Sequence, residues 1–164
     1  MGDIELRAWT ESEAPFYAEW TKDADVQRFT TDGPDITAET VARAIRAQRA
    51  NPAVVSFLVA DSHTGERHGN VALEIHDGVG EVSYLMAREA RGKGIATAAL
   101  TTFVGWIFAN IALDELRLWT HADNVASRKV AERAGFVRDP DNDRDREIKG
   151  EIWPTAAYRQ PRPN

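Results

Sequence analysis

The sequence predicts an α/β (α+β) fold, in which a mixed, mostly antiparallel twisted sheet of about six to seven strands carries helices on both faces. Three patterns predict it. Apolar or alternating segments separated by turn residues fill positions 54–87, a basic glycine loop at 91–94 opens into an apolar helix pattern, and strand, helix and strand patterns follow from 115 to 136. The 164 residues fit a single domain, 1–164, with the order β, α, α, β, β, β, α, β, α, β.

The first third of the chain predicts one strand and two helices. Residues 4–9 alternate like a strand, and Thr10-Glu11-Ser12-Glu13 has the form of a capping box ahead of a helix that carries Phe16, Tyr17 and Trp20. A second helix is expected from Thr37 to Asn51-Pro52, because apolar residues recur there at helical spacing. Together the two helices predict a helical cover over the early chain.

Three antiparallel strands are expected next. Residues 54–60 form an unbroken apolar run of strand length, 61–67 read as a turn, and 70–76 alternate between apolar and polar residues. Asp77-Gly78 then predicts a tight turn into the strand from Gly80 to Ala87.

The middle of the chain predicts a long helix, a strand and a shorter helix. Apolar side chains recur at helical spacing from Ile95 to Ile111, so the long helix must pack against the sheet. Residues 115–121 predict a strand and 124–134 a short helix, and Gly135 is expected to end that helix and release the chain into a strand at Phe136.

Charged residues dominate the segment 138–151, which we expect to be an exposed loop or hairpin. The last strand is expected either at 149–153 or at 156–159. Residues 160–164 contain two prolines and are expected to be frayed.

Composition narrows the function classes. The formal net charge of −6 disfavours nucleic acid as a partner, and the absence of cysteine excludes thiol nucleophiles and cysteine-bound metals. His63 and His68 have no third ligand at matching spacing, so no metal is expected. The chain begins without a basic and apolar leader, and its longest apolar stretch is too short to cross a bilayer. We therefore expect a cytoplasmic protein with no membrane association.

The loop Arg91-Gly92-Lys93-Gly94-Ile95-Ala96 fits the pattern R-x-x-G-x-A and opens directly into the long helix. Small residues at a helix N-terminus expose backbone N–H groups and the positive end of the helix dipole, which together favour a phosphate. The P-loop pattern fails because Lys93 precedes the second glycine. A dinucleotide G-x-G-x-x-G is half met, but Thr97 stands where its third glycine should be. The loop therefore predicts a phosphorylated cofactor of another class.

With this loop, the preceding strand, and the later Asn124-Val125-Ala126-Ser127 and Ala134-Gly135-Phe136 in view, the chain resembles the GNAT superfamily of acetyl-CoA-dependent N-acetyltransferases. The match is closest to the Rim-type (RimJ/RimL-like) branch. The resemblance is firm from Gly80 to Phe136 and loose elsewhere. It implies a sheet that splays between its fourth and fifth strands, where the thioester would be held.

The resemblance also implies a set of acetyl-CoA contacts and no metal. Backbone N–H groups of the loop would wrap the pyrophosphate, the end of the preceding strand would pair with pantetheine, and the start of the short helix would lie near the sulfur. The residues implied are Leu85, Met86, Ala87, Arg91, Gly92, Lys93, Gly94, Ile95, Ala96, Thr97, Asn124 and Ser127.

The same resemblance suggests the catalytic residues. Many relatives carry an acidic tyrosine where this chain has Ala131, so Ser127 is the candidate acid, although Ser127 and Asn124 would equally suit the first turn of a helix. Glu81 is the first candidate base, acting through water. Glu74, His76 and His121 are weaker candidates, and each could be an ordinary strand residue.

The reaction implied is transfer of acetyl from acetyl-CoA to a primary amine, by direct attack in a ternary complex. The acceptor is either a protein N-terminal α-amine or a small-molecule amine. An amine with a pKa near 8 is more often neutral at pH 7 than a lysine side chain with a pKa of about 10.4, so it needs less help from a base. A non-catalytic CoA-binding sensor and an NAD(P)-dependent oxidoreductase stay open as alternatives. Both a monomer and a homodimer are compatible with the sequence.

Overall fold

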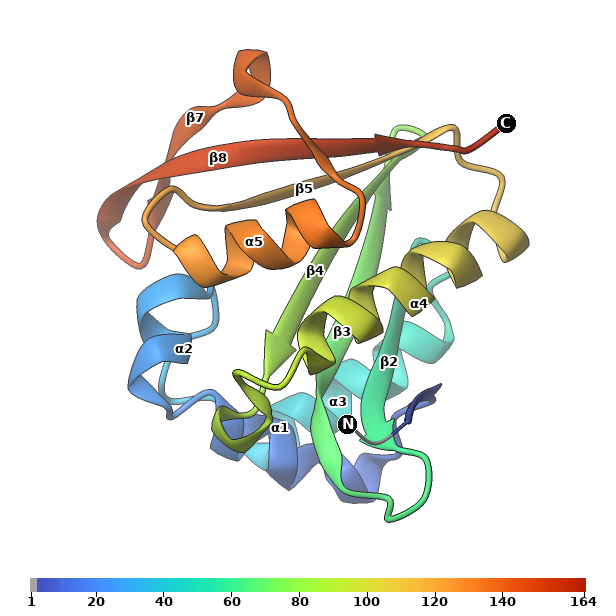
Figure 1. Cartoon of the computed structure of the whole chain (residues 1–164). Helices are drawn as coiled ribbons and strands as arrows, with labels where there is room; N and C mark the ends of the chain where they lie inside the picture. The colour runs from blue at the N-terminus through green and yellow to red at the C-terminus, as the bar shows by residue number, and fades with distance from the viewer. Residues whose placement is uncertain (1–2) are drawn as a thin grey trace.

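A computed structural model describes residues 3–164, which form an eight-stranded sheet with helices on both faces (Figure 1). The strands are β1 (Ile4–Arg7), β2 (Val54–Asp61), β3 (Arg67–His76), β4 (Val79–Met86), β5 (Glu115–His121), β6 (Val137–Arg138), β7 (Arg144–Ile148) and β8 (Glu151–Pro161). Their order is β1-β2-β3-β4-β5-β8-β6, and β7 pairs with β8 outside this path. The predicted mixed, mostly antiparallel sheet is confirmed. It exceeds the predicted six to seven strands because the charged segment contributes β7.

β4 and β5 run parallel and pair at one end only. Within the described chain, pairing is recorded between Gly80 and Leu116 and between Glu81 and Arg117. Figure 1 shows the two strands diverging from that end. A Cβ atom on Gly80 would come within 2.8 Å of the side chains of Leu113 and Leu116, so any larger residue there would force these side chains to shift. The predicted splay between the fourth and fifth strands is confirmed.

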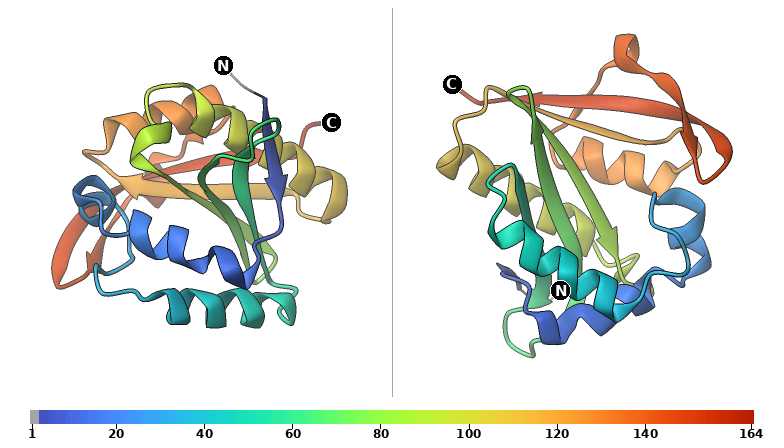
Figure 2. Two further views of the ribbon diagram at one scale, coloured as in Figure 1. Left: turned by 90° about the horizontal axis from the view of Figure 1, so that it is seen from below. Right: turned by 180° about the vertical axis from the view of Figure 1, so that it is seen from behind.

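The helices divide between the two faces of the sheet (Figure 2). α1 (Ala14–Trp20) and α3 (Ala38–Arg49) cover one face, and α4 (Ile95–Asn110) and α5 (Val125–Arg133) cover the other. The sequence did not predict α2 (Ala24–Phe29), because six residues are too few to show a helical apolar period. Its first turn is capped by the carboxylate of Asp23, which accepts from the N–H groups of Asp25 and Val26 at 3.1 and 3.2 Å.

The core consists of an apolar layer on each face of the sheet. On one face α4 contributes completely buried side chains, among them Leu100, Phe103 and Ile107, each worth about 1.5–3 kcal/mol of burial. On the other, Leu58 of β2 packs with residues of α1 and α3. The predicted packing of the long helix against the sheet is confirmed, and it fixes the N-terminus of α4 beside the end of β4. In residues 3–164 no helix is long and apolar enough to cross a membrane.

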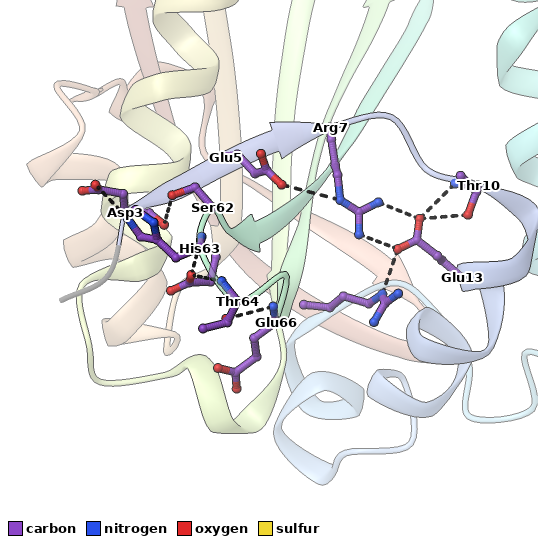
Figure 3. Close-up of polar contacts among 11 residues, drawn as sticks. Asp3, Glu5, Arg7, Thr10, Glu13, Ser62, His63, Thr64 and Glu66 are labelled. Atoms are coloured by element: carbon purple, nitrogen blue, oxygen red, sulfur yellow. Dashed lines mark hydrogen bonds and ion pairs between the residues drawn. The ribbon is translucent and has the colours of Figure 1, made fainter.

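A buried carboxylate joins β1, the turn after it and β3 (Figure 3). Glu13 is 4% exposed and accepts hydrogen bonds from both terminal guanidinium nitrogens of Arg7 and from Nε of Arg67, all at 2.8 Å. It also accepts the N–H of Thr10, as the predicted capping box requires. Burial acts to raise the pKa of Glu13, but these hydrogen bonds outweigh it and lower the pKa to about 2.

The C-terminal segment is more ordered than the sequence suggested. β8 overlaps both expected positions of the last strand, and its hairpin with β7 turns at Lys149 and Gly150, whose φ angles are +52° and +79°. The expectation of a frayed end was wrong for residues 160–162. Pro161 lies opposite Glu115, and the Arg162 guanidinium donates to carbonyl oxygens at the end of α4 and after it, those of Phe108, Ile111 and Leu113.

Candidate functional site

The glycine loop leaves a run of backbone N–H groups unused at the N-terminus of α4. Gly92 and Gly94 adopt left-handed φ angles of +74° and +76°, and Gly94 is the N-cap of the helix. The first N–H bonded within the helix is that of Ala98, which donates to the carbonyl of Gly94. For the N–H groups of residues 92–97, no acceptor is recorded in residues 3–164. Six consecutive donors and the positive end of a 16-residue helix are groups that favour an anion.

Arg91 holds this loop against α2 and the end of β4. Its guanidinium donates to Asp23 at 2.9 Å, to Asp25 at 3.4 Å and to the carbonyl of Met86 at 3.3 Å. Its own N–H donates to the carbonyl of Arg88. Arg91 therefore positions the loop through its side chain, while the N–H groups that lack an acceptor belong to the six residues after it.

The end of β4 offers main-chain groups on the side where β5 has moved away. The N–H of Ala87 donates to the carbonyl of His68 at 2.7 Å, on the β3 side. Because ladder groups alternate between the two sides of a strand, Leu85 shares that direction, and Tyr84 and Met86 direct theirs toward the diverging side. Of the three residues expected to pair with pantetheine, Met86 thus has the suitable direction.

Asn124 and Ser127 lie at the first turn of α5, which packs beside β4 and β5. The Asn124 side chain accepts the N–H of Ser127 at 3.1 Å and so caps the helix. The Ser127 hydroxyl lies 2.7 Å from the hydroxyl of Tyr84, which is also 2.8 Å from the Ser127 carbonyl oxygen. Sequence reasoning missed Tyr84, although its place between Val82 and Met86 in the alternation of β4 puts it on the α5 side.

Burial determines the protonation of Tyr84. It raises the pKa of the Tyr84 hydroxyl to about 12, against a smaller lowering by the hydrogen bond with Ser127. Tyr84 is therefore neutral near pH 7 and carries one proton, which it can share with either oxygen of Ser127.

Glu81 lies on the opposite face of the sheet from Tyr84, because the two positions differ by an odd number of residues in β4. Its carboxylate accepts the indole N–H of Trp119 at 3.1 Å. The guanidinium of Arg146, from β7, lies 4.1 Å from the centre of the Trp119 ring. Sequence reasoning missed Arg146, since it lies in the charged segment that was expected to be exposed. The candidate base, Glu81, and the candidate acid, Ser127, therefore lie on opposite faces of the sheet.

The weaker candidates have other contacts. Glu74 lies opposite Glu81 on β3, and its exposed carboxylate is 3.1 Å from the ring of His76. His121 accepts the N–H of Asp123 and packs between the rings of Phe29 and Trp153.

The histidines offer no metal centre in the part of the chain that the structure describes. His63 is exposed and lies 3.5 Å from Asp3, whereas His68 is buried. No group of three or more potential ligands is found among residues 3–164.

Comparisons with known proteins agree with this geometry. Residues 3–137 match the family described as Acetyltransferase (GNAT) domain. YdaF of Bacillus subtilis (strain 168), a candidate ribosomal N-acetyltransferase, is 36% identical over 59 residues, which are 36% of this chain and only 32% of that protein.

Two solved structures have a similar fold. The spermidine N-acetyltransferase of Vibrio cholerae, in complex with CoA and spermine, gives a TM-score of 0.86 at 18% identity over 97% of this chain and 95% of that one. The ribosomal-protein-S5-alanine acetyltransferase of Vibrio fischeri gives 0.84 at 18% identity over 99% and 94% of the two chains. At such identities the likeness concerns the fold.

Proposed function

The chain belongs to the GNAT acetyltransferase family, and we propose that it is an N-acetyltransferase of the Rim-type branch that moves acetyl from acetyl-CoA to a primary amine. The observation that carries this proposal is the run of six N–H groups at residues 92–97 for which no acceptor is recorded in residues 3–164, beside the end of β4 that lies away from its pairing with β5. A pyrophosphate bound there would place the rest of the cofactor along the free side of β4.

Main-chain groups at the end of β4 would hold the thioester. The pantetheine arm would pair with the diverging side of β4 in the manner of an added strand, and an N–H directed to that side, such as that of Tyr84, would polarise the acetyl carbonyl. A prepositioned donor of this kind is worth about 3 kcal/mol of barrier. The amine nitrogen then attacks the carbonyl carbon, the C–S bond breaks, and the amide and the CoA thiolate are the products.

Two protons must move in this reaction, and each face of the sheet would serve one of them. Glu81, fixed by the indole N–H of Trp119, would take the proton of the attacking amine through water. On the other face, Ser127 would give its hydroxyl proton to the departing sulfur. The Tyr84 hydroxyl donates to the Ser127 carbonyl and lies 2.7 Å from the Ser127 hydroxyl, so it can turn its proton to the serine oxygen as the serine proton leaves; Tyr84 is thus a positioning residue.

Cofactor binding is the first experiment. The melting temperature is measured with acetyl-CoA, CoA, NAD and NADP, because saturation at about 100 times the Kd adds about 2.7 kcal/mol to the free energy of unfolding. We expect stabilisation by both forms of CoA. Stabilisation by NAD(P) and not by CoA would contradict the proposal and favour an oxidoreductase.

Turnover is the second experiment. Release of the CoA thiol is followed with N-terminal peptides, lysine, polyamines and aminoglycosides as acceptors. Release that depends on one of these amines supports the enzyme. Tight binding of acetyl-CoA without release across the whole panel would instead indicate a sensor.

A further inference from the structure

Arg146 is a partly buried cation near Glu81, and no ion pair of its guanidinium is recorded within residues 3–164. It extends from β7 across β8 to the ring of Trp119. The β8 residue opposite Arg146 is Trp153, and the β8 residue opposite Trp119 is Ala157. Burial and the neighbouring Arg144 guanidinium lower the pKa of Arg146, although the Glu81 carboxylate acts to raise it.

No side-chain hydrogen bond or ion pair of Arg146 is recorded within residues 3–164, and its Nε is buried without an acceptor. Other partly buried arginines in this structure are paired, for example Arg7 with Glu13, Arg91 with Asp23 and Arg138 with Asp143. A buried guanidinium N–H without an acceptor costs free energy, so such a group is usually explained by a ligand or a function.

Trp119 places this cation next to the candidate base. One indole ring lies under the Arg146 guanidinium and donates its N–H to Glu81 at 3.1 Å. The Glu81 carboxylate and the Arg146 guanidinium therefore both contact the Trp119 side chain. Glu81 belongs to the part of β4 that pairs with β5. An acceptor that lies across this ring meets a site of matching opposite charges if its ammonium faces Glu81 and an anion faces Arg146.

We propose that Arg146 binds a carboxylate of the acceptor, so that the substrate is a primary amine that also carries a carboxylate. This inference rests on the proposed acetyltransferase function. A guanidinium matches a carboxylate with two parallel N–H donors, which gives both attraction and orientation. A polyamine such as spermidine would instead bring positive charge against Arg146, so we expect it to be a poor acceptor here.

A binding experiment tests the proposal without requiring turnover. The buried Nε–H of Arg146 is followed by ¹⁵N–¹H NMR, in the free and the CoA-saturated protein, and assigned from its loss in Arg146→Lys. The probes are glycine, β-alanine, 4-aminobutyrate and the peptides Ala-Asp-Gly-amide and Ala-Asn-Gly-amide, each acid being compared with its amide. A saturable shift with a carboxylate probe and none with its amide supports the proposal. No shift with any carboxylate, or equal shifts with acids and amides, overturns it.

The rate of acetylation is then compared for each acid and its amide. The small amino acids and the acidic peptide represent the two possible sources of the carboxylate. We expect kcat/KM for the preferred acid to exceed that for its amide at least tenfold, and this preference to fall to about one in Arg146→Gln. Arg133→Gln, which removes the same charge from the exposed end of α5 on the other face of the sheet, should keep the preference. Efficient acetylation of amides or polyamines by the wild type would overturn this inference and leave the proposed function intact. Failure to bind CoA at all would contradict the proposed function, and the NMR result with the free protein would still decide the role of Arg146.

Discussion

Replacing Gly94 by aspartate should strongly weaken acetyl-CoA binding while leaving the fold intact. Gly94 is the N-cap of α4, and its φ of +76° is a left-handed conformation that costs other residues about 1–2 kcal/mol. A carboxylate at a helix N-terminus recovers about 0.3–1 kcal/mol from the dipole. The free energy of unfolding should therefore fall by no more than about 1.7 kcal/mol.

The effect on binding is larger. Two unit charges at 4 Å repel by about 1 kcal/mol in water and by about 4 kcal/mol at an effective dielectric of 20. The carboxylate introduced by Gly94→Asp would face a diphosphate at the mouth of six N–H donors. A loss of about 2–3 kcal/mol is therefore a modest expectation, which corresponds to a Kd raised about 30- to 150-fold.

Gly78→Asp is the matched control. Gly78 has nearly the same φ, +78°, with no atom near its Cβ position, and it lies in the β3–β4 turn away from the loop. This variant carries the same backbone strain and the same added charge without the helix N-terminus. Calorimetric titration with acetyl-CoA should give a wild-type Kd for Gly78→Asp and a much weaker one for Gly94→Asp. An unchanged Kd in Gly94→Asp, or an equal loss in both variants, would refute the assignment of the loop.

Further predictions concern stability and chemistry. Glu13→Gln should lower the free energy of unfolding by about 2–3 kcal/mol in urea denaturation, since it leaves Arg7 and Arg67 without their buried anion. Wild-type stability of this variant at neutral pH would contradict the structural role of Glu13. The pKa of Glu13 is lowered from 4.5 to about 2, so its contribution should be complete above pH 4.5 and lost as the pH falls toward 2, a loss absent in the variant. Ser127→Ala should lower kcat with little change in the Kd for acetyl-CoA, and Tyr84→Phe should lower it less while altering the pH profile of kcat. Equal kcat and an identical profile in the wild type and both variants would exclude both roles.

Local patterns in the sequence predicted most of the elements that build the site. The strand 115–121 has the predicted bounds, and the helix expected at 124–134 forms at 125–133 with Gly135 at a φ of +99° after it. The glycine loop was predictable because its function depends on local backbone geometry, namely small residues at a helix start.

The features that the sequence did not predict depend on contacts between distant residues. β7 has the sequence Arg-Asp-Arg-Glu-Ile, whose charges obscure a strand that forms because it pairs with β8. Arg162 is ordered by carbonyl groups about 50 residues earlier in the chain. Tyr84 and Ser127 are likewise 43 residues apart, so their contact could not be read from spacing.

The most direct test of the central claim follows the backbone amides of residues 92–97 by ¹⁵N–¹H NMR while CoA is added. These N–H groups lack acceptors within residues 3–164, so we predict that they shift together, saturably and with the largest changes in the spectrum, and that ADP, which carries the diphosphate without the thiol arm, moves the same signals. Saturable CoA binding that shifts other amides and leaves these six unchanged would contradict the account.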